Sequence, residues 1–225
     1  MIKANTFTLE YYGSILGLAK QQGYQILTLE DFWDKGCPTT KTLVLRHDVD
    51  VKTDTLKRML DVERKHGCCS TLYVRVAGAP YNVLSYPLYR VLSDARADGF
   101  AIGLHTNYFE FATLNNESPL VVLSKETKII QTVFPGVRSL ASHRDHDFVH
   151  NCLPHVEEHW VAIQGMGFDF QAYDKRIHDA AEYVNEGYLG RLTWRNKTPE
   201  EVIRIGRSLF IMTHSHWWHE IHPFE

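Results

Sequence analysis

The chain has 225 residues, of which 44% are hydrophobic and 23% are charged, so it is long and apolar enough to fold around a core. Its net charge of -3 and its mixed acidic and basic residues argue against nucleic acid or an anionic membrane surface as a partner. No apolar run is long enough to span a bilayer, no signal peptide is evident, and the four cysteines lack disulfide or zinc-site spacing, so we expect a cytoplasmic protein.

Segments with helical and strand periodicity alternate along the chain. In chain order they are a helix over 9–22, a strand over 24–27, a short helix from 28 to about 36, a strand over 41–46, a helix over 53–66, a strand over 70–76, a helix over 86–98, a strand over 100–104, a helix over 119–134, a strand over 137–141, a helix over 147–155, strands over 167–170 and 188–192, a helix from 198 and a strand over 209–213. This alternation predicts an α/β fold with a mostly parallel sheet, open or closed into a barrel. Because no repeat or linker interrupts it, we expect a single domain over residues 1–225.

Side chains that can bind a metal or move a proton follow four of the predicted strands. They are His47, Asp48 and Asp50 after the strand over 41–46, His105 after 100–104, His143 and Arg144 after 137–141, and His214 and His216 after 209–213. The carboxyl ends of parallel strands meet at one rim, so we expect these groups to lie together. Imidazole and carboxylate ligands suit zinc or another first-row divalent ion.

A plainer explanation competes with the metal site. Asp48 and Asp50 could simply form a turn and cap the following helix, as aspartates often do. That explanation accounts for one strand end, whereas a metal site accounts for all four. Trp217 and Trp218 are equally consistent with a core and with a substrate cleft.

An Asp-x-Asp pair has a specific chemical use in such a site. One carboxylate can hold the metal while the other takes a proton from metal-bound water, whose pKa the metal lowers to roughly 7. A histidine from another strand can then protonate the leaving amine. Asp48, Asp50, His105 and His214 are sufficient for these roles.

These motifs resemble those of the NodB-type polysaccharide deacetylase superfamily, also called carbohydrate esterase family four. The segment 47–50 (His-Asp-Val-Asp) is similar to a variant of its first motif, and 102–105 (Ile-Gly-Leu-His) is similar to the start of its second. The segment 70–74 is similar to its second strand, and 209–214 to its last motif, a hydrophobic strand ending in histidine. The resemblance runs in order from about residue 41 to 218. It implies a distorted (β/α) barrel, often with seven strands, with Asp48 as general base, Asp50 and His105 as metal ligands and His214 as general acid.

The chain departs from the family pattern in two places. Phe109 stands where the second histidine of the second motif is expected, and the third motif is replaced by 142–146, Ser-His-Arg-Asp-His. The resemblance gives Arg144 the task of orienting the base carboxylate. We favour His143 as the third ligand, because family members with a similar first motif tend to carry a His-Arg pair here, and Glu110 is the alternative.

The expected function is removal of an N-acetyl or O-acetyl group from a sugar or glycan precursor. It would use water bound to a divalent metal, zinc first and cobalt or nickel otherwise, to break a non-peptide carbon–nitrogen bond. The side chains expected to contact the sugar are Trp194, His216, Trp217 and Trp218. Two alternatives stay open: a cyclic amide or imide hydrolase on the same scaffold, and a non-catalytic carbohydrate-binding relative that has lost its metal. The sequence does not indicate an oligomeric state.

Overall fold

The computed structural model describes residues 7–51, 54–76, 81–143, 152–186 and 193–221. Eight strands in this part of the chain form one sheet, and all their pairings are parallel. Seven of them lie in the order β6-β5-β4-β3-β2-β8-β7, and β1 joins beside β2. Their bounds are β1 (Gln25–Leu27), β2 (Thr42–Val49), β3 (Thr71–Arg75), β4 (Ala101–Thr106), β5 (Ser139–Ser142), β6 (Phe170–Gln171), β7 (Glu182–Asn185) and β8 (Leu209–His214).

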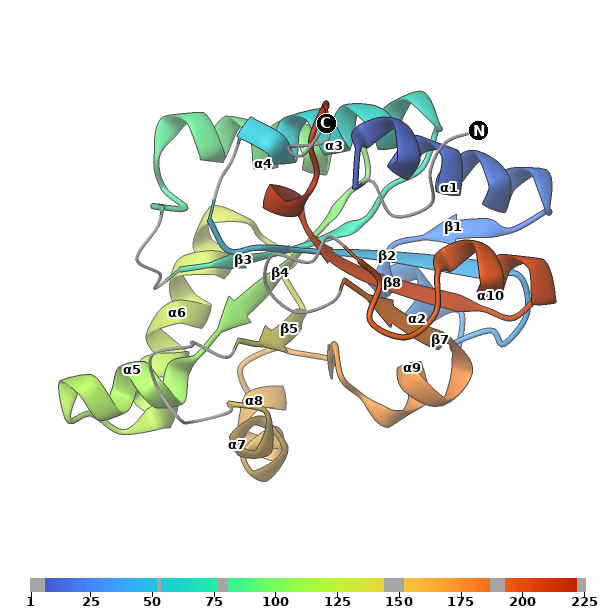
Figure 1. The fold of residues 1–225 in the computed structure, drawn as a ribbon. Helices are drawn as coiled ribbons and strands as arrows, with labels where there is room; N and C mark the ends of the chain where they lie inside the picture. Colours follow the sequence, from blue (N-terminus) through green and yellow to red (C-terminus); the bar gives the residue numbers. More distant parts are fainter. Residues whose placement is uncertain (1–6, 52–53, 77–80, 144–151, 187–192, 222–225) are drawn as a thin grey trace.

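The strand β2 lies at the centre of the fold and has three neighbours. Strand β8 pairs with residues 43–48 along one edge, while β1 pairs with 42–44 and β3 with 46–49. Because a strand has only two edges, β1 and β3 share the second one. The sheet curls into a distorted, incompletely closed α/β barrel surrounded by helices (Figure 1). The predicted fold class is confirmed, and β1 adds an eighth strand to the row of seven.

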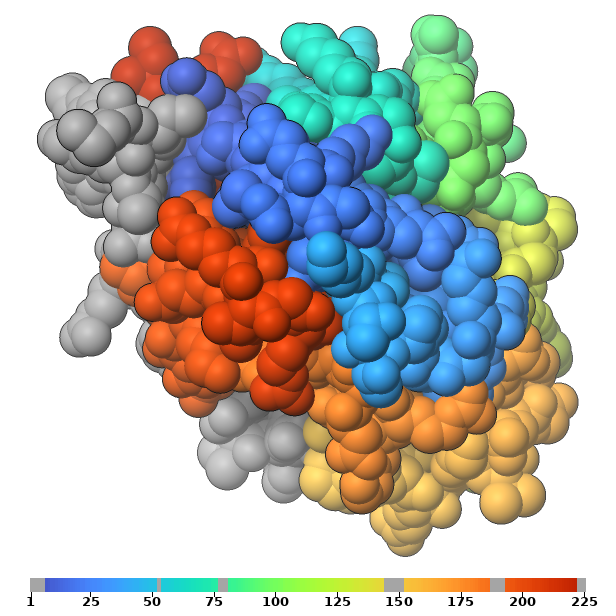
Figure 2. Space-filling model, turned by 90° about the vertical axis from the view of Figure 1, so that its right-hand side faces the viewer, coloured from blue at the N-terminus to red at the C-terminus, as the bar shows by residue number. Residues whose placement is uncertain are grey.

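Helices connect most of the strands. They are α1 (Leu9–Gln21), α2 (Leu29–Asp34), α3 (Asp54–Lys65), α4 (Tyr86–Ala97), α5 (Tyr108–Asn115), α6 (Pro119–Val133), α7 (Leu153–Glu158), α8 (Trp160–Gln164), α9 (Lys175–Ala180) and α10 (Pro199–Ile205), followed by the single 3-10 turn η1 (Ser215–Trp217). Thr28 and Thr198 cap α2 and α10, and Thr198 forms a capping box with Glu201. Helices α1 and α10 lie side by side on the face shown in Figure 2. None of the helices in the described ranges combines the length and apolar character needed to cross a bilayer.

Alternation along β2 separates two apolar layers. Leu43 and Leu45 pack on the outer side of the sheet against α1 and α10. Val44 packs on the inner side, in a cluster that includes Tyr73 and Phe210 from the neighbouring strands. Successive side chains of a strand point to opposite faces, so the even-numbered residues of β2 continue the inner side toward its carboxyl end.

Several elements differ from those predicted. Strand β2 continues to Val49 because residues 46–49 still pair with β3, so Asp48 lies within the strand and not in a loop. The helix predicted over 147–155 is described only from Leu153, and the strand predicted over 188–192 lies outside the described residues. Helices α5, α8 and α9 and strand β7 were not predicted. In α5 the apolar residues are spread around the whole helix, so its sequence has no apolar stripe to recognise.

Candidate active site

The curled sheet brings the carboxyl ends of β2, β4, β5 and β8 to one rim. Asp50 directly follows β2, His105 lies in β4, His143 directly follows β5 and His214 ends β8. These residues lie at similar heights along their strands, because Asp48 is in register with His214 and His105 is in register with Ala141. The parallel sheet therefore collects these side chains as the sequence pattern predicts.

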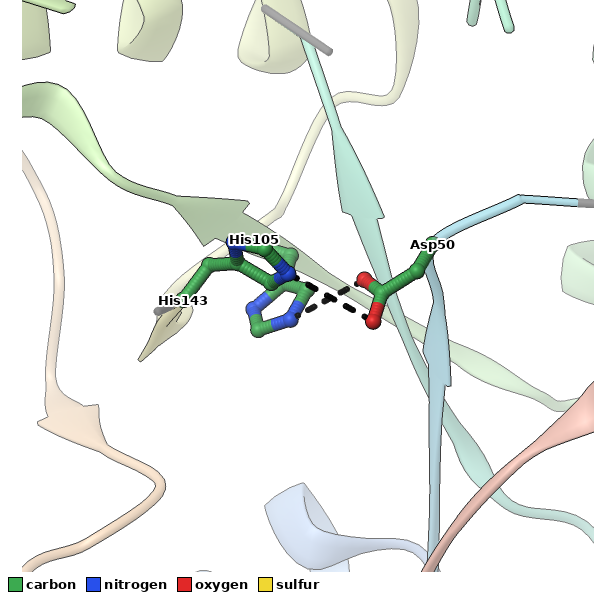
Figure 3. A group of neighbouring side chains, drawn as sticks. All are labelled: Asp50, His105 and His143. Carbon is green, nitrogen blue, oxygen red and sulfur yellow. Dashed lines mark ion pairs between the residues drawn. The ribbon is translucent and has the colours of Figure 1, made fainter. Parts of the chain in front are cut away.

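Asp50, His105 and His143 form the group of possible metal ligands in the described part of the chain. One ligand atom from each lies within 4.8 Å of the others. The Nε2 of His105 is 3.3 Å from Oδ1 of Asp50, and the Nε2 of His143 is 3.5 Å from Oδ2 (Figure 3). Burial alone would raise the pKa of Asp50, but hydrogen bonds from His105, His143 and His214 hold it well below its ordinary value.

The arrangement of His105 fits a cation at this point. Its Nδ1 lies 3.0 Å from the carbonyl oxygen of Ala141, which only accepts hydrogen bonds, so Nδ1 carries the hydrogen. Nε2 is therefore the ring nitrogen that faces the Asp50 carboxylate, and it is the one that would bind a metal there. Ligand atoms about 2.0–2.1 Å from a tetrahedral zinc ion lie roughly 3.3–3.4 Å apart. The separations of 3.3 Å from His105 to Oδ1 of Asp50 and of 3.5 Å from His143 to Oδ2 are close to that spacing, although they join different oxygens of the carboxylate.

His143 is held beside His105 by the backbone. Its N–H donates to the carbonyl oxygen of Thr106 at 2.7 Å, which extends the pairing of β5 with β4 by one residue. The rings of His105 and His143 are 4.8 Å apart and nearly perpendicular. Glu110, the alternative ligand, is buried, accepts a hydrogen bond from Asn107 and lies outside the group of possible ligands.

Phe109 points away from this group. It lies in α5, and its ring stacks on His155 of α7 with centroids 3.5 Å apart. Position 109, where the family pattern expects a second histidine, therefore contributes to the packing of α5 against α7.

Asp48 lies on the inner side of β2 beside the ligand group. Its Oδ2 is 3.5 Å from Nε2 of His105. Arg46, two residues earlier on the same face, donates from Nε to Oδ1 at 2.7 Å and from Nη2 to Oδ2 at 2.8 Å. Burial alone would raise the pKa of Asp48, but the charges of Arg46 and His105 outweigh it and lower the pKa. His47 points to the opposite face, where its Nε2 lies 2.5 Å from Oε1 of Glu63.

His214 approaches Asp50 from β8. Its Nε2 is 3.2 Å from Oδ2 of Asp50, while Nδ1 donates to Oε1 of Glu186 at 2.8 Å. The backbone N–H of His214 donates to the same oxygen at 2.6 Å. Burial lowers the pKa of His214, but the Glu186 carboxylate and the bond to Asp50 raise it well above its ordinary value. Sequence reasoning missed Glu186 because it follows β7, the strand that was not recognised.

In the described part of the chain, the arginine beside Asp48 is Arg46. Arg144, which the resemblance implied for this task, lies outside the described residues. Arg46 was passed over although its position gave a signal, because residues i and i+2 of a strand share a face.

Two of the four predicted sugar-contacting side chains are buried. Trp218 has no exposed surface, lies in the outer core and donates from Nε1 to Thr213 at 2.7 Å. Trp194 is 8% exposed and donates from Nε1 to the hydroxyl of Tyr11 at 2.9 Å. Both rings complete the packing around α1, so we assign contact with the sugar to neither of them. His216 and Trp217 are half-buried in η1, next to His214.

Comparison with known proteins identifies the fold. No family model matches the chain, and no curated protein matches it. A solved structure of the Streptococcus pyogenes deacetylase PplD in complex with acetate has a TM-score of 0.53 and 14% identity, and the match covers 87% of this chain and 85% of that one. The chitin deacetylase of the fungal pathogen Colletotrichum lindemuthianum matches with a TM-score of 0.46 and 14% identity over 79% of this chain and 74% of that one. The chain therefore shares its fold with a solved deacetylase.

Proposed function

We propose that the protein is a metal-dependent hydrolase that removes an acetyl group from the nitrogen, or from an oxygen, of a sugar or glycan precursor. The observation that carries the proposal is the group of Asp50, His105 and His143, with a second carboxylate and a third imidazole directly beside it. Ligands, a base and an acid around one point are what hydrolysis of an acetyl amide requires. The fold shared with a solved deacetylase agrees with this reaction.

One carboxylate and two imidazoles would hold the metal. This donor set suits zinc, and it also suits cobalt or nickel. A divalent ion held there supplies Lewis-acid polarisation of the acyl carbonyl and of the attacking water. The hydrogen bond from His105 to Ala141 keeps the ligating nitrogen turned toward Asp50.

Asp48 is the group that takes the proton from the attacking water. It lies beside His105, and its lowered pKa keeps it ionised and able to accept a proton at neutral pH. The two carboxylates thus have separate tasks: Asp50 binds the metal, and Asp48 accepts the proton.

His214 is the group that gives a proton to the leaving amine. Glu186 accepts the hydrogen of Nδ1, so Nε2 is the nitrogen that faces the rim and carries the transferable proton. We assign contact with the sugar to His216 and Trp217, which follow His214 and are half-buried. A half-exposed indole can cover the apolar face of a sugar ring.

The test begins with the metal. The purified protein is stripped with a chelator, reloaded with zinc, cobalt or nickel, and assayed for acetate release from N-acetylglucosamine oligosaccharides and from an O-acetylated sugar. We expect tight binding of one ion and turnover only in the loaded form. Asp48→Asn should keep the metal and lose roughly 10²- to 10⁴-fold in kcat, the usual contribution of a general base.

His66→Ala provides a matched control, because His66 follows α3 at the opposite end of the strands. It should keep both metal and turnover. A protein that binds none of the three ions contradicts the proposal. Loaded protein that opens a cyclic imide but releases no acetate supports the alternative hydrolase, and loaded protein that does neither supports a binding role.

A further inference from the structure

We infer that Arg46 is the residue that positions the carboxylate of Asp48. The inference rests on the proposed function, because it concerns the base of that reaction. It is carried by the geometry of a fully buried arginine on the same strand face as the base.

The contact between Arg46 and Asp48 fixes both oxygens of the carboxylate. Two parallel N–H···O bonds of 2.7 and 2.8 Å join the side edge of the guanidinium to the carboxylate. Such a paired contact restrains rotation of the carboxylate about its own axis, which a single charge does not. The group so oriented stands 3.5 Å from the ligand His105.

The guanidinium is itself restrained by two tyrosines. Its carbon lies 4.6 Å from the ring centre of Tyr173 and 5.0 Å from that of Tyr73. Nη2 also donates to the hydroxyl of Tyr173 at 3.1 Å. Nη1 has no hydrogen-bond partner in the described part of the chain, so the directed contacts of Arg46 go to Asp48 and Tyr173 alone.

Tyr73 connects this pair to residues near the amino ends of the strands. Its hydroxyl donates to Ser139 at 3.0 Å, and the Ser139 hydroxyl donates to Glu30 at 2.5 Å. Gly103 makes room for the ring, because a Cβ there would lie 2.3 Å from the Tyr73 ring. An unbroken series of contacts thus links Glu30, through Ser139 and Tyr73, to Arg46 and Asp48. This series supports the base from the side of the sheet where the strands begin.

Arg46→Lys tests the inference because it keeps the charge but removes the paired contact. We expect unchanged metal content, a KM within about threefold of the parent, and a kcat lower by about 100-fold, the size of loss that a displacement of roughly 1 Å produces. Arg138→Lys is the matched control, since Arg138 makes two ion pairs, with Asp34 and Asp169, just before β5 begins. It should leave kcat unchanged.

Adding guanidinium ion to the assay distinguishes a lost positioning contact from a general loss of structure. In Arg46→Ala, millimolar guanidinium should restore part of kcat, whereas the same addition should not restore Asp48→Asn. If Arg46→Ala does not fold, Tyr173→Phe takes its place, because it removes one bond to Arg46 and should lower kcat several-fold with KM unchanged. Parental kcat in Arg46→Lys overturns the inference and leaves the proposed function standing.

A crystal structure of Arg46→Lys decides the inference without an activity assay. A displaced or rotated Asp48 carboxylate supports it, and a carboxylate in the parental orientation overturns it. If loaded parent protein hydrolyses none of the acetylated probes, the proposed function fails, and the orientation of Asp48 still gives the answer for Arg46.

Discussion

Glu126 makes the stability of the protein depend on pH. It lies in α6, is 5% exposed, and accepts a hydrogen bond from Thr106, the residue that follows His105. Burial raises the pKa of Glu126 from 4.5 to about 7, although the hydroxyl of Thr106 and the charge of Arg75 act against it. We predict that Glu126→Gln, which cannot ionise, removes this dependence.

The size and sign of the effect follow from proton linkage. The shift from 4.5 to about 7 is about 2.5 units, and at 1.36 kcal/mol per unit it corresponds to about 3 kcal/mol. The folded state holds the proton more tightly than the unfolded chain, so this contribution is fully present below pH 4.5 and is lost as the pH rises through 7. Relative to the parent, Glu126→Gln should gain up to about 3 kcal/mol between pH 4.5 and pH 8.

Urea unfolding of both proteins at pH 5, 6, 7 and 8 measures this gain. Because every other group titrates equally in the two proteins, the difference between their free energies of unfolding isolates Glu126. The difference should grow steadily with pH and level off near pH 8. A difference that stays constant across the series would mean that Glu126 is ionised throughout, and it would refute the reasoning.

Five further substitutions probe the rim and the core. His143→Ala should lower metal affinity by more than the roughly 10- to 100-fold that loss of an outer partner costs, whereas Glu110→Gln should keep it, as measured by metal titration of the stripped protein. Trp218→Ala should cost about 3–5 kcal/mol in urea unfolding because its ring is fully buried, and Trp217→Ala should cost less and act on KM. Gly103→Ala should cost about 1–3 kcal/mol by the same measurement, since its Cβ would overlap a buried tyrosine ring.

The sheet and the rim were predictable because their signals are local and repeated. Each strand of the central row except β7 overlaps a strand expected from the sequence, and the parallel arrangement follows from the alternation of strands with helices. From that arrangement alone, Asp50, His105, His143 and His214 belong at one rim. The structure places them within reach of one another.

The parts that escaped prediction depend on contacts between distant segments. Glu186 is separated from His214 by 28 positions, and only the pairing of β7 with β8 brings it to the imidazole. Trp194 and Trp218 are amphipathic side chains that suit a cleft as well as a core, and their burial is decided by the packing of α1. No pattern within one segment carries that information.

The place of the proposed third ligand, His143, follows from strand pairing and not from the local motif. Helix α5 begins at Tyr108, immediately after the cap Asn107, and turns Phe109 toward His155, so the position four residues after His105 offers no ligand. Strand β5 runs parallel to β4 with His105 opposite Ala141. His143, two residues after Ala141, therefore lies just beyond the end of β5, at the same rim. The bond from the His143 N–H to Thr106 holds it there. A neighbouring strand can therefore place a candidate ligand at the rim where α5 offers none, because the pairing of β4 with β5 fixes the register of both strands.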